Sequence, residues 1–243
     1  MSLLTGRRLV VVDTETTGFD PQHGHELVEV ATVTLADGAI AEEWSSLVRP
    51  GRSIPTDASA IHGITDAMTS GAPPPAEIAV LLRTRCAEHL LVFHNACFDL
   101  PFLRALLRGA GQRPLLAPVL DTLGLARGLF GPGGNSLAAL ARRLDLPAET
   151  AHRALADART TARALPLLTD RWERERGAVS LEELAAASMD QVRLTRSARP
   201  AALPVARTRD DATIPPRDPG TAARDMPPGP LFEGLLAIPI ARG

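Results

Sequence analysis

Three apolar segments near the start of the chain constrain its fold more than any other feature. They run from Leu9 to Val12, from Leu27 to Leu35 and from Ile40 to Val48. Short segments rich in branched apolar residues are typical of strands. The pair Asp37-Gly38 separates the second segment from the third, and Asp-Gly favours the tight turn of a hairpin. The sequence therefore predicts three successive strands, the last two of them antiparallel.

Strand and helix signals alternate through the middle of the chain. Short apolar runs at Leu90 to Phe93 and at Val119 to Asp121 are typical of buried strands. Helical periodicity is expected over four segments, namely 76–88, Leu100 to Arg108, Ser136 to Leu144 and Arg153 to Leu168. This order predicts an α/β fold in which helices flank a mixed central sheet.

Length and composition are those of a soluble enzyme. With 243 residues and a hydrophobic content of 45%, the chain can bury one sizeable core. There is neither a run of 18 apolar residues nor a signal-like start. Cys86 and Cys97 have no metal-ligand spacing, so we expect neither a zinc site nor a disulfide framework. We therefore expect a cytoplasmic protein with no membrane partner.

Two carboxylates follow the first predicted strand. Asp13 and Glu15 are two residues apart, and residues at this spacing in a strand point to the same face. Such a pair can hold a divalent metal ion, although acids at strand ends are more often solvated turn residues. Further candidates are Asp99 after the strand expected at 90–93, and His152 with Asp157. The four acids and His152 form the candidate catalytic set.

A second candidate for metal binding is the histidine pair in the string QHGHE. It consists of His23 and His25. This pair could bind a metal ion, but we favour an exposed loop over a metal site.

The residues around the acids make the ordered set resemble a known family. The matching strings are DTETTG around Asp13 and Glu15, IHGIT at Ile61 to Thr65, His94 and Asn95 before Asp99, and AHRALADA with His152 and Asp157. Over about residues 7 to 170 the chain resembles the DnaQ-like branch of the DEDD superfamily, in its His variant. The best-known member of this group of 3'-5' exonucleases is the proofreading epsilon subunit of bacterial DNA polymerase III. The resemblance implies a ribonuclease H-like fold, which the order of strands and helices also favours.

The resemblance also implies roles for the matching residues. Asp13, Glu15 and Asp157 would hold the metal ion that carries the attacking water. Asp13 would bridge to a second metal ion, and Asp99 would complete the site directly or through water. The 3'-terminal nucleotide would be bound at seven positions, namely Thr16, Thr17, Phe19, Ile61, His62, Asn95 and Phe98. For two of these a plainer interpretation stays open, since Phe98 could be a core residue and His62 a turn residue before Gly63.

The chemistry of phosphodiester hydrolysis explains why these residue types are needed. Two metal ions about 3.5–4 Å apart activate the attacking water and neutralise the charge on the leaving 3'-oxygen. Carboxylate oxygens suit Mg²⁺ or Mn²⁺. His152 fits the role of general base, since imidazole is mostly neutral at about pH 7. Five positions on a helix turn by about 140° net, so we place Asp157 in a helix and His152 on the loop or first turn before it.

The chain is expected to divide into three parts. These are an exonuclease domain at 1–175, a helical extension at 176–192 and a flexible tail, rich in Pro, Ala and Arg, at 193–243. The tail ends in the more apolar string PGPLFEGLLAIPI, and such a segment can dock on a partner. The resemblance implies a DNA polymerase as that partner. A sliding clamp, bound through Leu231-Phe232, is an alternative, although the glutamine that opens clamp peptides is absent.

The function expected is that of a metal-dependent 3'-5' exonuclease, which releases nucleoside 5'-monophosphates from a single-stranded 3' end in proofreading or repair. DNA is favoured over RNA because DTETTG and IHGIT look more like the DNA-directed members, and an RNA-processing exoribonuclease is the alternative. A net charge of −2 provides no general attraction for nucleic acid. We therefore expect a short footprint near the 3' end, helped by Arg104 or Arg108.

A function of a different class is a catalytically silent module that binds 3' ends or stabilises a polymerase. Its signature would be the loss of an acid or of the histidine. All five residues are present, which favours the enzyme.

Overall fold

A computed structural model describes residues 2–87, 89–150 and 152–197, and these fold around one mixed sheet of five strands. The strands are β1 (Arg8–Thr16), β2 (Leu27–Ala36), β3 (Ala39–Leu47), β4 (Leu90–Phe93) and β5 (Val119–Asp121). They lie in the order β3-β2-β1-β4-β5. β2 is antiparallel to both of its neighbours, β1 and β3, whereas β4 is parallel to both β1 and β5. The prediction of a mixed central sheet is confirmed, and β1 lies at its centre.

The turn between β2 and β3 is the hairpin predicted from Asp37-Gly38. Both residues have positive φ, at 54° for Asp37 and 80° for Gly38. Two consecutive residues of positive φ are the mark of a turn whose twist matches that of the strands it joins. The local sequence therefore determines the pairing of these two strands.

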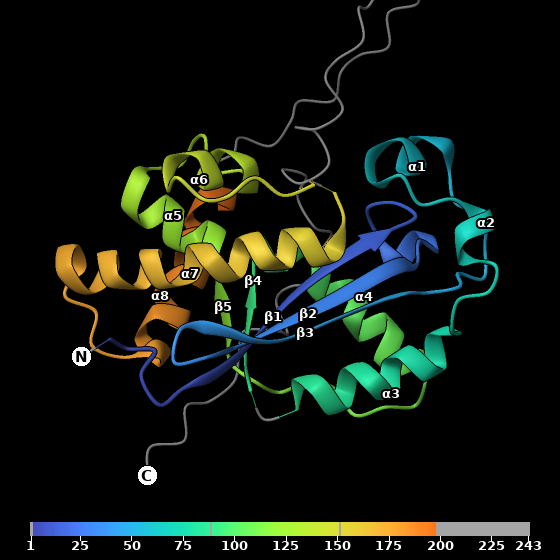
Figure 1. The fold of residues 1–243 in the computed structure, drawn as a ribbon, viewed down its shortest axis with the longest axis horizontal. Coiled ribbons are helices and arrows are strands. Elements are labelled where there is room, and N and C mark those ends of the chain that lie inside the picture. Colours follow the sequence, from blue (N-terminus) through green and yellow to red (C-terminus); the bar gives the residue numbers. More distant parts are fainter. Residues whose placement is uncertain (1, 88, 151, 198–243) are drawn as a thin grey trace, which may run out of the picture.

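Helices cover both faces of the sheet (Figure 1). They are α1 (Thr56–His62), α2 (Asp66–Thr69), α3 (Pro75–Cys86), α4 (Ala96–Gly109), α5 (Thr122–Phe130), α6 (Leu137–Arg143), α7 (Ala154–Arg176) and α8 (Leu181–Ser197), with one 3-10 turn, η1 (Pro21–His23). The four predicted helices are found as α3, α4, α6 and α7. Two of them are longer than predicted, because α4 begins at Ala96 and α7 continues to Arg176.

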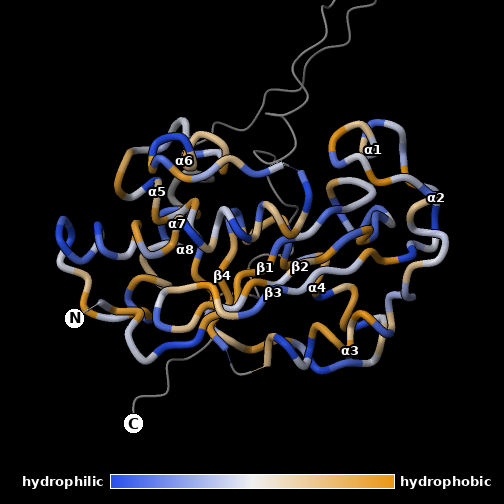
Figure 2. The backbone as a smooth tube through the Cα atoms, in the orientation of Figure 1, coloured by the Kyte–Doolittle hydropathy of each residue, from blue (hydrophilic) through white to orange (hydrophobic). Residues whose placement is uncertain are grey.

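The central strand separates two hydrophobic cores. Leu9 and Val11 of β1 pack with residues of α5, α7 and α8. Val10 and Val12 point to the other face and pack with residues of α3 and α4. Figure 2 shows the apolar strands converging between these two helical layers. Because β1 keeps its pairing with β2 beyond Val12, it continues through Asp13 and Glu15 to Thr16 instead of ending before the acids.

The last described helix belongs to the first of these two cores. Leu181 and Leu184 of α8 are buried in it. The approach of α8 to α5 is close, since a Cβ atom at Gly124 would lie 2.0 Å from the carbonyl oxygen of Ser188. The Ser188 hydroxyl also accepts a hydrogen bond from the Asp121 N–H at 3.0 Å. The α8 helix is therefore fitted against the end of β5.

Most of the expected tail lies outside the described residues, which end at 197. The apolar string at its end and the pair Leu231-Phe232 fall there too. Among the residues that are described, no helix combines the length and the apolar character needed to cross a bilayer.

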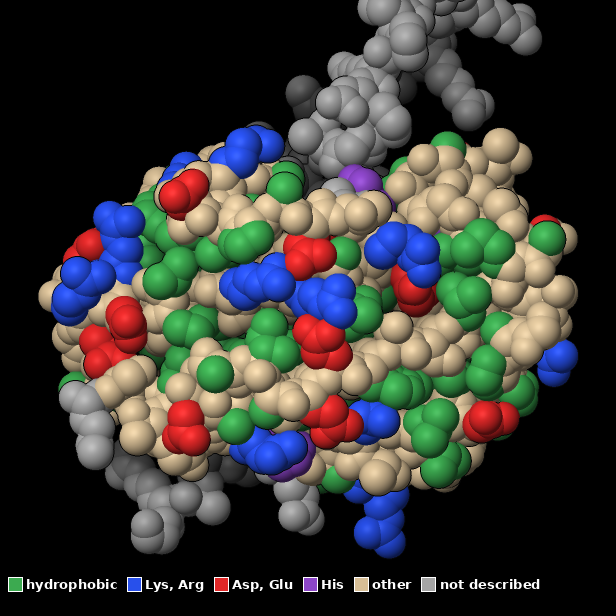
Figure 3. All heavy atoms as spheres, in the orientation of Figure 1, with side chains coloured by type: hydrophobic (Ala, Val, Ile, Leu, Met, Phe, Trp, Pro, Cys, Tyr) green, Lys and Arg blue, Asp and Glu red, His purple; other side chains and the backbone are tan. Residues whose placement is uncertain are grey.

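Charges of both signs are interspersed on the surface in view in Figure 3. One ion pair joins β3 to α7, since Arg159 donates from Nε to Glu43 Oε1 at 2.9 Å and from Nη2 to Oε2 at 2.6 Å. The hydrogen bonds from Arg159 hold the pKa of Glu43 below its ordinary value of 4.5. The side chains of Arg159 and Glu43 are 32% and 29% exposed, so solvent screens the ion pair. Its contribution to the free energy of unfolding is at most about 1 kcal/mol.

A pH-dependent loss of stability follows from this ion pair. A carboxyl group whose pKa is lowered in the folded state stabilises the fold at pH values above its ordinary pKa of 4.5. This contribution is lost as the pH falls through the lowered pKa. We expect Glu43→Gln to reduce the free energy of unfolding by up to about 1 kcal/mol at about pH 7. Urea unfolding of the variant and the wild type should converge as the pH falls below 4.5. A difference that persists into acid would contradict this account.

Candidate metal centre and adjoining pocket

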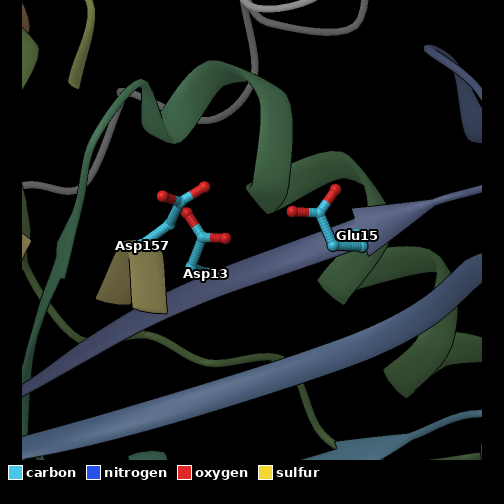
Figure 4. Close-up of side chains that lie close together, drawn as sticks. All are labelled: Asp13, Glu15 and Asp157. Carbon is cyan, nitrogen blue, oxygen red and sulfur yellow. The ribbon is translucent and has the colours of Figure 1, made fainter. Parts of the chain in front are cut away.

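Three buried carboxylates meet beside the central strand. Asp13, Glu15 and Asp157 each offer an oxygen, and the three oxygens lie within 4.8 Å of one another. Asp13 and Glu15 project from the same side of β1, and Asp157 reaches them from the first turn of α7 (Figure 4). The three residues are 3%, 7% and 6% exposed, in that order. The alternation of β1 and the placement of Asp157 in a helix, both predicted from spacing, produce this arrangement.

Electrostatic repulsion makes these carboxylates a site for a cation. Two ionised carboxylates at this separation repel by about 3 kcal/mol at an effective dielectric constant near 20. A divalent ion bound between them would relieve the repulsion of every pair. The donors are all oxygen, which is the ligand set that hard cations prefer. The residues present therefore fit a divalent metal ion.

The fourth predicted acid lies apart from this group of three. Asp99 is buried in the first turn of α4. Its Oδ1 accepts a hydrogen bond from the Thr14 hydroxyl at 2.7 Å. Thr14 lies between Asp13 and Glu15 in β1 and so points to the opposite face of the sheet. Asp99 thus approaches β1 from the side of α4, whereas Asp157 approaches from the side of α7.

The predicted general base lies on the loop just before α7. His152 has a φ of 60°, which is the left-handed region. Its backbone N–H donates to Asp157 Oδ2 at 3.2 Å. This position agrees with the helical geometry that excluded His152 and Asp157 from one helical face. His152 therefore borders the carboxylates and is attached to one of them.

A pocket of about 160 Å³ adjoins the carboxylates at the carboxyl end of β1. Both Glu15 and His152 line it. Six of the seven residues expected to bind a nucleotide also line it, namely Thr16, Thr17, Phe19, Ile61, His62 and Phe98. Phe19 is 45% exposed, so a large apolar side chain stands open at this pocket. Such a concave, partly apolar site next to a polar cluster is the usual form of a ligand site.

Asn95, the seventh expected residue, is not among the residues that line the pocket. It is the residue before α4 and has a φ of 76°. Its N–H donates to Asp121 Oδ1 at 3.1 Å. The structure thus places Asn95 at the start of the helix that carries Asp99.

His62 lies directly before the turn at Gly63, and it also lines the pocket. It is the last residue of α1, and Gly63 ends the helix in the left-handed conformation with a φ of 71°. The His62 side chain is buried and accepts a hydrogen bond at Nδ1 from the Ile64 N–H. Burial lowers the pKa of His62, so the ring is neutral at about pH 7. His62 therefore presents a neutral imidazole to the pocket.

The sequence did not predict that His25 lines the pocket. The structure separates it from His23, which lies beside Asp20 on the exposed turn η1. His25 shares a hydrogen bond between Nδ1 and the Thr17 hydroxyl at 3.3 Å. A Cβ atom at Gly18 would lie 2.3 Å from the His25 ring. Gly18, the glycine of the DTETTG string, therefore leaves the space that the His25 ring occupies at the pocket.

Asp121 also escaped prediction, although it organises the elements around Asp99. It is fully buried at the end of β5. Its carboxylate accepts four backbone N–H groups, from Asn95 and Ala96 at the start of α4 and from Leu123 and Gly124 in α5. Burial raises the pKa of Asp121, and the four N–H donors act in the opposite direction. One carboxylate thus connects the starts of two helices.

The chain is similar in sequence to a known protein family and to several curated proteins. A model of the family described as "Exonuclease" matches residues 10–165. The chain is 44% identical over 188 residues to a DNA polymerase III subunit epsilon-like protein of Rhodobacter capsulatus. That match covers 71% of this chain and 26% of the relative, so the chain spans about a quarter of the length of this curated protein.

Two further similarities cover most of the matched protein. The chain is 34% identical over 173 residues to the DNA polymerase III subunit epsilon of Rickettsia prowazekii, covering 68% of this chain and 76% of the relative. A solved structure described as Exonuclease X in complex with 5' overhanging duplex DNA has a TM-score of 0.59 and 31% sequence identity. That alignment covers 74% of this chain and 99% of the other. The expected ribonuclease H-like fold is confirmed.

Proposed function

The chain belongs to the exonuclease family, and from this premise we propose that it is a metal-dependent 3'-5' exonuclease. It would hydrolyse phosphodiester bonds from the 3' end of DNA and release nucleoside 5'-monophosphates. The observation that carries the proposal is the meeting of three buried carboxylates within 4.8 Å beside a pocket that His152 lines. A family member that had lost its catalytic function would have no need to keep this costly set of charges.

The residues divide the work of hydrolysis. Asp13, Glu15 and Asp157 would hold the metal, with Asp99 completing the site from the side of α4. Two bound Mg²⁺ or Mn²⁺ ions would supply an activated water and would neutralise the charge on the leaving oxygen. His152 would take the proton from the attacking water.

The pocket would hold the 3'-terminal nucleotide next to these groups. Phe19 and Phe98 offer apolar surface for a base or sugar, and Thr16 and Thr17 offer hydroxyl groups. Neutral His62 adds a polar group without a charge. Asn95 would contact the nucleotide from the start of α4, at a position next to the residues that line the pocket.

DNA is the substrate that the comparisons favour. The relatives described above are named for DNA polymerase III, and the Exonuclease X structure contains duplex DNA with a 5' overhang. By analogy we propose a role in proofreading or repair in the cytoplasm, with a polymerase or a sliding clamp contacted through residues beyond 197. RNA processing and silent binding of 3' ends are the alternatives that the experiment must separate.

The test is hydrolysis of matched 3'-tailed DNA and RNA oligonucleotides, labelled at the 5' end, with Mg²⁺ and then with Mn²⁺. We expect DNA to shorten stepwise from the 3' end. His152→Ala should slow this about a hundredfold, the low end of the usual contribution of a general base. Faster cleavage of RNA would make the protein an exoribonuclease. Binding of 3' ends without cleavage of either the DNA or the RNA oligonucleotide would overturn the enzyme proposal.

A further inference from the structure

Glu29 of β2 is a buried carboxylate close to the candidate metal centre. It has no part in the proposed hydrolysis. It pairs directly with Glu15 across the antiparallel β1 and β2. Side chains paired in this way lie on the same face of the sheet, with Cβ atoms about 4.5–5.5 Å apart. Glu29 is only 4% exposed. A second buried acid thus stands beside a candidate metal ligand and needs a compensating charge.

The compensation comes from the residues that directly follow His152. Arg153 donates to Glu29 from Nε at 3.1 Å and from Nη2 at 2.7 Å. The Ala154 N–H donates to Glu29 Oε2 at 2.9 Å. The hydrogen bonds to Glu29 raise the pKa of Arg153, and the charge of Glu15 acts in the same direction. One carboxylate therefore accepts three hydrogen bonds from two consecutive residues at the start of α7.

These contacts restrict the backbone conformation of the neighbouring residue His152. Its φ of 60° is disfavoured for a residue with a side chain. A loop adopts such a conformation only where its surroundings impose it. On its carboxyl side, Arg153 and Ala154 are fixed by Glu29. Within α7, Asp157 accepts the His152 N–H at 3.2 Å.

We propose that Glu29 and Arg153 are positioning residues, which hold His152 in its left-handed conformation at the edge of the carboxylate group. Arg153 also places a positive charge against Glu29, which pairs with Glu15 across the two strands. Neither residue would touch the substrate. The inference depends on the proposed function, because that function makes His152 the general base. The contacts of Glu29 and Arg153 are observed independently of any function.

A second ion pair of the same form provides the control. Arg159 lies in α7, six residues after Arg153, and holds Glu43 of β3 through two hydrogen bonds, just as Arg153 holds Glu29. Breaking either pair would remove a contact between the α7 segment and the sheet. Only the pair of Glu29 and Arg153 adjoins His152. Glu29→Gln and Glu43→Gln therefore separate positioning of His152 from general attachment of the helix.

The kinetic test uses the full chain and a 3'-tailed DNA oligonucleotide. We expect Glu29→Gln to lower kcat by about 10- to 100-fold, the range for residues that orient a reacting group, with KM changed less than about threefold. Glu43→Gln should leave kcat within about twofold. In the His152→Ala background, Glu29→Gln should cause no further fall in kcat, because the residue that it positions is gone. An equal fall in both backgrounds, or an equal effect of Glu43→Gln, would overturn the proposal.

A second measurement does not depend on activity. Amide hydrogen exchange of the protein without metal or substrate reports how firmly the segment around His152 is held. We expect Glu29→Gln to speed exchange at His152 and Ala154 by at least about tenfold, while amides of the central strand β1 keep their protection. Unchanged exchange at both residues would refute the positioning role even in an active enzyme. Faster exchange in a protein without exonuclease activity would instead refute only the proposed function.

Discussion

Replacing Asp13 with asparagine is expected to reduce metal-dependent hydrolysis by roughly a thousandfold or more. Asp13 lies in the group of three carboxylates and shares one face of β1 with Glu15. Metal ions supply several kcal/mol of transition-state stabilisation, and about 4 kcal/mol corresponds to three powers of ten in rate. An asparagine of the same shape removes one negative charge from the ligand set, so the metal is held weakly or in the wrong place.

The same substitution should leave the protein folded. Two carboxylates at this distance repel by about 3 kcal/mol at an effective dielectric constant near 20, so the variant without metal should be at least as resistant to urea as the wild type. Initial rates over a range of Mg²⁺ concentrations, with unfolding curves in EDTA, would test both statements. Asp170→Asn, on the exposed surface of α7, is the control and should stay within about twofold in rate. Full activity of Asp13→Asn would exclude the metal mechanism.

The largest loss of stability is expected from Asp121→Ala. The free energy of unfolding should fall by about 4 kcal/mol, because four backbone N–H groups lose their acceptor in a fully buried place. Each buried donor left unsatisfied costs about 1–3 kcal/mol, and the costs of neighbouring groups do not add in full. The starts of α4 and α5 would lose their common cap.

Asp121→Asn is a graded comparison for this prediction. Oδ1 accepts three of the N–H groups, whereas Oδ2 accepts only that of Ala96, at 2.9 Å. An asparagine can keep the three and lose the one, so its cost should be that of one unsatisfied donor, about 1–3 kcal/mol, and below that of the alanine. Urea unfolding followed by far-ultraviolet circular dichroism would measure both. Equal losses for the two variants would mean that the negative charge, rather than the number of acceptors, stabilises this corner of the fold.

The fold could be predicted where local sequence decides the structure. The strands follow from short apolar runs, and the hairpin follows from Asp37-Gly38, whose positive φ values few other residue pairs adopt. The helix α5 was missed because its segment contains Gly124 and Gly128, which disfavour helices. The structure explains these glycines, since Cβ atoms there would lie 2.0 Å from Ser188 and 2.3 Å from Trp172. Tertiary packing thus outweighs helix propensity at this place.

The site was predictable to the extent that it depends on spacing. Asp13 and Glu15 converge because a strand alternates, and the position of His152 before the helix follows from the helical repeat. His25 and Glu29 could not be found in this way, because their importance depends on which residues face them. The pairing of Glu29 with Glu15 becomes visible only with the register of β1 and β2. The cap at Asp121 likewise depends on two parallel strands lying side by side.

The placement of β1 limits how the chain can change during evolution. Asp13 and Glu15 face one layer of the protein, and the residue between them faces the other, where it binds Asp99. Insertion or deletion of a single residue in this strand would exchange the two faces. It would turn the acids away from Asp157 and bury charges in the opposite core. Descendants of this chain can therefore gain or lose residues in the loops around the sheet, while the length of β1 has to remain constant.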